Sequence, residues 1–176
     1  MQLRRALGDS WGIAAALNNL ARATEGENDY AQAELLYIES LELFRGMADK
    51  SNSVNPLANL GWMTLAQDQY QRSRQYFIES LSASQDLGYQ EGIANALQGL
   101  AHLAAIDGQR IQAARLIGVV DRLYQQSDIR LSPLDDARYS KTIAAIQARV
   151  DEAAYATAWA EGQTLAVEQI IDALLA

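Results

Sequence analysis

The chain repeats itself every 40 residues, and this period limits the possible folds more than any other feature of the sequence. Leu20, Leu60 and Leu100 lie 40 residues apart, and many neighbouring positions repeat in step with them. The other shared positions are Leu17/Leu57/Leu97, Ala21/Gly61/Ala101, Ala33/Ser73/Ala113 and Tyr37/Phe77/Ile117. A fixed period of this length is typical of arrays in which each repeat is one supersecondary unit.

Within each copy, apolar residues recur at the spacing of an amphipathic helix. In the first copy they fall at Leu17, Leu20, Ala21 and Thr24, and then at Ala33, Leu36, Tyr37 and Leu41. Turn-forming residues follow the first run at 26–29, 67–69 and 107–109. We therefore expect a pair of helices in each copy, with Tyr37, Phe77 and Ile117 filling the space between neighbouring pairs. Each pair leaves an apolar face uncovered, so the pairs are expected to stack.

The C-terminal residues 127–176 depart from the repeat and are expected to form capping helices. The expected helices run from the N-cap Ser132 to about Val150, from the N-cap Asp151 to Ala160 with Gly162 as the stop, and from the N-cap Thr164 onward. The third copy is looser than the others, because Arg110, Gly118 and Asp121 replace Tyr30, Ile38 and Leu41.

The N-terminal residues 1–9 align with the end of a second helix in the 40-residue register. We therefore expect them to be the remnant of a preceding repeat helix, and the chain to be a piece of a longer protein. The alternative is a short protein whose residual helix is its own cap.

The composition limits the kinds of partner. The net charge of −8 would repel nucleic-acid phosphates and anionic membrane surfaces. No apolar run approaches the ~18 residues that a membrane span needs, and no secretory signal pattern is found. With no cysteine and no sign of secretion, a cytoplasmic location is expected.

Little in the sequence could carry catalysis or hold a cofactor. One histidine and no cysteine exclude most metal sites and nucleophile–base pairs made within the chain. The acidic stretch at 25–29 does not have the spacing of a calcium-binding loop, so a solvated turn is favoured. We expect no enzymatic activity, no cofactor and no metal.

The order of large, leucine, small and aromatic positions resembles the tetratricopeptide repeat, with a longer period, over about residues 10–126. The resemblance implies an all-α fold, a right-handed superhelical α-solenoid of helix-turn-helix repeats. The repeats would span about 10–48, 49–88 and 89–126, followed by the C-terminal cap.

A second resemblance rests on the runs 114–118 (ARLIG), 158–162 (AWAEG) and 168–171 (EQII). These are similar to the C-terminal ends of large bacterial signalling proteins, which join an ATPase core, a tetratricopeptide region and an effector such as a LuxR-type DNA-binding domain. The resemblance implies a scaffold or sensor arm of such a transcription regulator or signal transduction protein. It carries over no ATPase or DNA-binding residue.

In tetratricopeptide stacks, the first helix of each pair lines a concave groove that binds a peptide or helix. The resemblance implies eight groove residues, namely Asn18, Arg22, Glu25, Asn55, Trp62, Asn95, Gln98 and His102. Amides suit a peptide backbone, and an exposed tryptophan is a typical interface anchor. The alternatives are that Trp62 packs over a neighbouring helix, that His102 is an ordinary half-buried residue, and that Arg22 only balances Glu25.

These patterns favour a protein–protein interaction module whose partner is a protein or peptide segment, possibly part of the same parent protein. One alternative is a homodimer formed through the groove or the exposed upstream face. Another is a sensor for a small ligand. Trp11 and Trp159, near the chain ends, are expected to be packing residues.

Overall fold

The computed structural model describes residues 9–148 and 150–175, and this part of the chain is all helical. By its internal contacts the chain divides into two compact units, one ending at Ala83 and the other beginning at Ser84. Each unit is described by itself below. The predicted remnant at 1–9 lies outside the described residues except for Asp9, whose carboxylate accepts a hydrogen bond of 2.8 Å from Gly12 N.

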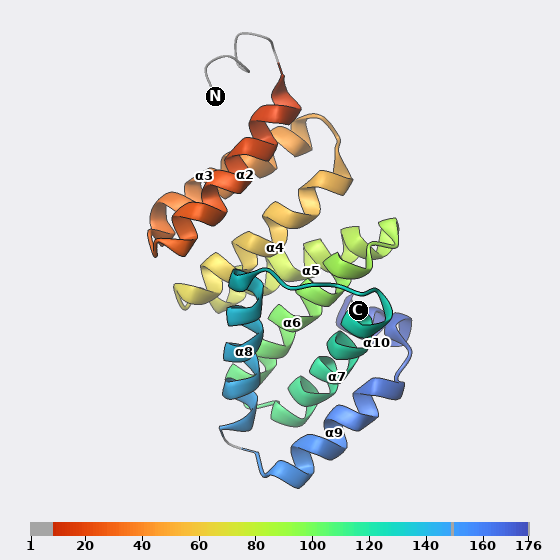
Figure 1. Ribbon diagram of the computed structural model, residues 1–176. Helices are drawn as coiled ribbons and strands as arrows, with labels where there is room; N and C mark the ends of the chain where they lie inside the picture. The colour runs from red at the N-terminus through yellow and green to blue at the C-terminus, as the bar shows by residue number, and fades with distance from the viewer. Residues whose placement is uncertain (1–8, 149, 176) are drawn as a thin grey trace. The chain divides into compact units, whose positions relative to one another are not determined.

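Three helix pairs follow one another along the chain (Figure 1). Their bounds are α2 Ser10–Gly26 with α3 Tyr30–Gly46, α4 Lys50–Ala66 with α5 Tyr70–Leu87, and α6 Gln90–Ile106 with α7 Arg110–Gln126. First helices begin at residues 10, 50 and 90, and second helices at 30, 70 and 110. The expected all-α repeat of helix pairs is confirmed, and the handedness of a solenoid stays a prediction.

The turns between helices share one backbone conformation, which the sequence did not reveal. A residue with positive φ follows each helix from α2 to α7, and these residues are Asn28, Ala48, Asp68, Gly88, Gly108 and Asp128. The next backbone N–H donates to the carbonyl five residues earlier in every turn, as from Asp29 N to Thr24 O at 3.2 Å and from Asp49 N to Phe44 O at 2.9 Å. This bond is the signature of the Schellman cap. Each helix of the repeat therefore ends in the same way, whichever residue fills the turn.

Ala48 is the only one of these turn residues with a plain Cβ and no polar side chain, and its φ is 54°. A Cβ in the left-handed region costs about 1 kcal/mol. We expect Ala48→Gly to stabilise the chain by about 0.5–1 kcal/mol, measured as a higher unfolding midpoint. Ala156→Gly, at an exposed alanine inside the helix Glu152–Thr164, is the matched control and should destabilise the chain by a similar amount. A loss of stability in Ala48→Gly would contradict the strain at this turn.

The core of the first unit joins α2, α3 and α4. Leu17, Tyr37 and Leu60 belong to one cluster of buried side chains drawn from these three helices. Phe77 lies against Gly61 of its own pair, where a Cβ would stand 2.6 Å from the Phe77 ring. The aromatic position thus fills space within its own pair, a contact that the sequence analysis had placed only between pairs.

The second unit ends in three more helices: α8 Pro133–Gln147, α9 Glu152–Thr164 and α10 Val167–Leu175. The predicted N-caps are confirmed, since the side chains of Ser132 and Asp151 accept hydrogen bonds from Asp135 N at 3.3 Å and Ala154 N at 3.0 Å. α8 packs against α6, and α9 packs against α7.

Two expectations about these helix ends were wrong. Gly162 does not stop the helix, because α9 continues to Thr164. Thr164 does not cap α10, since its hydroxyl donates to Glu161 O at 2.9 Å. Gly162 instead lies in the crossing of α9 with α7, where its Cα is 3.0 Å from the place that a Cβ on Gly118 would occupy.

Candidate functional site

The eight predicted groove residues fall into two groups by exposure. Asn55 is exposed, and Asn18, Arg22 and Asn95 are half-buried. Glu25, Trp62, Gln98 and His102 are buried. The expectation that all eight side chains line an open surface is therefore wrong for these four, and the partner-binding role of the other four stays a prediction.

In the first unit, the buried groove residues Glu25 and Trp62 each join the two helices of their own pair. The Tyr37 hydroxyl donates to the Glu25 carboxylate at 2.8 Å, which ties α3 to the end of α2. Trp62 is 5% exposed and meets Phe77 edge to face, with ring centroids 5.2 Å apart. An edge-to-face pair of this kind stabilises the fold by about 0.5–1.5 kcal/mol beyond the contribution of the apolar area that it buries. The structure thus favours packing, the alternative interpretation of Trp62.

In the second unit, Gln98 and His102 make hydrogen bonds inside the fold. The Tyr124 hydroxyl donates to Gln98 Oε1 at 2.8 Å. His102 Nδ1 lies 3.0 Å from Thr142 Oγ1, and the Thr142 hydroxyl donates to Arg138 O at 2.9 Å. Because that proton is used, His102 Nδ1 is assigned as the donor to Thr142. The histidine therefore joins α6 to α8.

Burial of His102, helped by the nearby charge of Lys141, lowers its pKa to about 4. The unfolded chain binds this proton near pH 6.5, whereas the folded chain does not, so stability falls as the pH drops from about 6.5 to about 4. We expect the titration of His102 to lower the free energy of unfolding by about 3 kcal/mol over that range. Denaturant unfolding of wild type and His102→Gln at pH 7 and pH 4 isolates the effect, because both share the carboxylate titrations. Equal losses in the two proteins would contradict a neutral buried His102.

An exposed strip on α2 is the surface feature that most distinguishes the first pair from the others. Leu20 is 48% exposed, whereas its register equivalents Leu60 and Leu100 are 0% and 2% exposed. Thr24 and five further positions follow the same pattern, and those five form the α2 strip together with Leu20. The α2 strip consists of Ala16, Asn18, Asn19, Leu20, Arg22 and Ala23, all exposed or half-buried. The equivalent positions on α4 and α6 are all buried, namely 56, 58, 59, 60, 62 and 63 on α4 and 96, 98, 99, 100, 102 and 103 on α6.

The α2 strip contains two of the predicted groove residues. Asn18 Oδ1 accepts a hydrogen bond of 3.4 Å from Asn59 Nδ2, which orients its amide. Arg22 lies one turn further along α2. The strip thus combines an apolar leucine and two alanines with amides and one arginine. Sequence reasoning missed Leu20 as a surface residue, because its register equivalents Leu60 and Leu100 are core positions.

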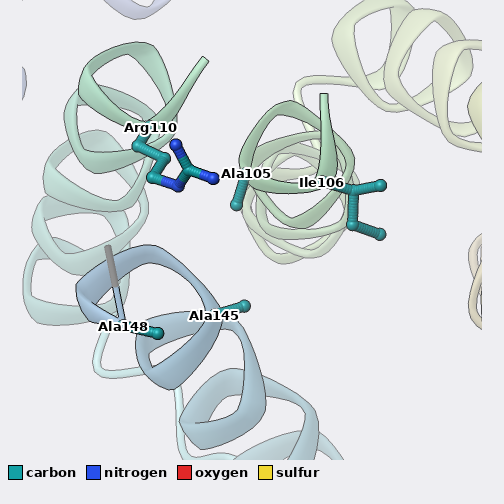
Figure 2. Close-up of a pocket in the computed structure, with 5 residues that line it drawn as sticks. All are labelled: Ala105, Ile106, Arg110, Ala145 and Ala148. Carbon is teal, nitrogen blue, oxygen red and sulfur yellow. The ribbon is translucent and has the colours of Figure 1, made fainter. Parts of the chain in front are cut away.

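A second candidate is a cavity of about 310 Å³ in the second unit, lined by Ala105, Ile106, Arg110, Ala145 and Ala148. Figure 2 shows the Arg110 side chain extending from the start of α7 towards Ala105, with Ala145 of α8 and the C-cap residue Ala148 nearby. Arg110 Nε is buried and has no hydrogen-bond partner among the described residues. The cavity therefore offers a guanidinium beside small apolar walls.

The remaining expectations have mixed outcomes. Trp11 is 52% exposed, so the expected packing role is wrong for it. Trp159 is half-buried and donates from Nε1 to Asp121 at 2.6 Å, as a packing residue would. Asp29, in the acidic stretch, accepts from Gln32 N at 3.2 Å as the N-cap of α3. Within the described residues, no group of acidic, histidine or cysteine side chains could hold a metal ion.

No family model, curated protein or solved structure matches the chain. Among the described helices, none has both the length and the apolarity that a membrane crossing needs.

Proposed function

We propose that the chain is a protein–protein interaction module that binds a segment of another protein, or of its own parent protein, on the α2 strip. The single observation behind this proposal is that six positions on α2 are exposed or half-buried, whereas their equivalents are buried in both other copies of the repeat. In a repeat array, such positions are covered by the neighbouring unit.

The chemistry of the α2 strip suits a polypeptide partner. Leu20 offers an apolar contact, and fully burying a leucine side chain contributes about 1.5–3 kcal/mol. Asn18 and Asn19 can donate to and accept from a peptide or polar side chains, and Arg22 can pair with a carboxylate. Ala16 and Ala23 leave room for close approach of a backbone.

A library of random peptides tests this proposal without a known partner. We expect the full chain to enrich peptides from the library. Their affinity for the Leu20→Asp variant should be about ten-fold or more lower than for the wild type, because the substitution places a charge in the interface. Leu87→Asp is the matched control, because Leu87 is also exposed, at 42%, but lies at the end of α5. Circular dichroism checks that both variants keep their helix content. Enriched peptides that bind both variants as tightly as wild type would refute the α2 strip as the binding surface.

We also propose that the module is a tetratricopeptide-like arm of a larger cytoplasmic signalling ATPase or transcription regulator. This proposal rests on the resemblance of the runs 114–118 and 158–162 to the C-terminal ends of such proteins, and in the structure these runs meet where α7 crosses α9 at Gly118 and Gly162. An immunoblot of source-cell lysate with an antibody against this chain tests it. A band far above 19.3 kDa is expected, and a band at that mass would count against a larger parent protein.

A second candidate function is a sensor for a small carboxylate, and the specific observation in its favour is the unpartnered Arg110 Nε beside the cavity. A short monocarboxylate such as butyrate would pair with the guanidinium and place its apolar chain against the alanines. Thermal unfolding should show a midpoint that rises with butyrate concentration in wild type and not in Arg110→Gln. Arg130→Gln, an exposed arginine of the same unit, should respond like wild type. An unchanged midpoint in wild type would remove this candidate.

A further inference from the structure

The chain itself shows what covers the register position of Leu20 in the next repeat. α3 packs against α4, and Leu60 of α4 shares its core cluster with Leu36, Tyr37 and Leu41 of α3. The first helix of a pair is therefore covered, at this position, by the second helix of the preceding pair. The described part of α2 carries the same leucine without that cover.

The residues beside Leu20 on α2 are small enough to let a helix pack closely. Ala16 and Ala23 stand where α4 has Pro56 and Met63, so the side chains beside Leu20 on α2 are smaller than those beside Leu60 on α4. Small residues beside one larger side chain let a helix approach closely while the leucine inserts between its side chains.

We propose that the α2 strip binds one amphipathic helix of the α3 type, packed on α2 as α3 packs on α4. Such a helix carries a small residue followed by apolar residues three, four and eight positions later, as at Ala33, Leu36, Tyr37 and Leu41 of α3. This inference rests on the proposed function and names the partner of the same surface.

The probe is a synthetic peptide of residues 29–47, the chain's own α3 with its N-cap, titrated into the full chain. We expect saturable binding with a gain of helix signal in circular dichroism, because the peptide folds as it binds. Leu20→Asp should weaken binding by about ten-fold or more. The control Leu87→Asp should bind like wild type. A peptide of the same composition, with its apolar residues no longer on one face, should not bind.

Two outcomes would overturn the inference. One is the absence of saturable binding by the α3 peptide up to about 1 mM, which corresponds to only about −4 kcal/mol. The other is a dimer of the free chain in sedimentation equilibrium that Leu20→Asp dissociates, because a second copy would then occupy the strip. A monomer that binds the α3 peptide supports the inference.

The outcome of the library experiment separates this inference from the proposed function. Binders that depend on Leu20 but lack the helical apolar pattern would leave the interaction module standing and refute an α3-type partner. Failure of both the library and the α3 peptide to bind through Leu20 would refute both proposals.

Discussion

Gly118→Ala is expected to destabilise the second unit by about 2–4 kcal/mol and to loosen α9 from α7. A Cβ at Gly118 would stand 2.2 Å from Trp159 O and 3.0 Å from Gly162 Cα. Both are backbone atoms, so no side-chain rotation can relieve the clash. The helices would have to separate, which would also strain the hydrogen bond of 2.8 Å from Gln163 Nε2 to Gly118 O.

The reciprocal variant and a matched control make this prediction specific. Gly162→Ala should have a similar effect, because its Cβ would stand 2.1 Å from Arg115 O. Gly46→Ala, at the end of α3, has no atom within 4 Å of the added Cβ and should be neutral or stabilising by up to about 1 kcal/mol. The measurements are the unfolding midpoint and hydrogen exchange of α9 amides. Unchanged protection of α9 in Gly118→Ala would contradict the tight crossing.

Much of the fold follows from the 40-residue register alone. The positions of the helix pairs could be predicted because an apolar residue must face the core wherever the register repeats, as at Leu17, Leu57 and Leu97, all of which are buried. The N-caps Ser132 and Asp151 could be predicted because they depend only on local hydrogen bonds.

What the sequence could not provide depends on contacts between segments far apart in the chain. Gly118 looked like a loosening of the third repeat, and Gly162 looked like a helix stop, because the local pattern does not show that the two glycines meet. Trp62 and His102 fit the positions of groove residues, but positions in a family pattern do not reveal which neighbours bury them. Exposure at the α2 strip likewise depends on which helix is next to it.

The first helix of the first pair, α2, and the second helix of the third pair, α7, differ in what the chain packs on them, and this difference bears on function. α9 covers part of α7 through the glycine crossing, so this surface is occupied within the unit. In the first unit, the α2 strip is left exposed. A search for partners should therefore begin with α2, since the α7 surface can bind another molecule only by displacing α9.

Asp121→Leu is the second substitution with a large expected effect, although it restores the residue found at the equivalent positions. Leu41 and Leu81 are 3% and 0% exposed, so repeat averaging would favour leucine at 121. In the structure, the Asp121 carboxylate accepts hydrogen bonds from Trp159 Nε1 at 2.6 Å and from the Tyr139 hydroxyl. Burial first, and then this hydrogen bond, raises the pKa of Tyr139, which keeps its phenol protonated as a donor.

We expect Asp121→Leu to lower the free energy of unfolding by about 2–4 kcal/mol, because two partly buried donors on α8 and α9 lose their acceptor together. Asp121→Asn keeps one oxygen acceptor and should lose about half as much. Asp172→Leu, an exposed acid of α10, should change stability by less than about 0.5 kcal/mol.

A double-mutant cycle of Asp121→Leu with Trp159→Phe decides whether the loss comes from this contact. Phenylalanine lacks the indole N–H, so part of the effect of Asp121→Leu should disappear in the Trp159→Phe background, with a coupling of about 1 kcal/mol or more. Additive losses would mean that the carboxylate does not hold α9. Coupled losses would show that the carboxylate at this position of the third repeat stabilises the unit by holding α9 through Trp159.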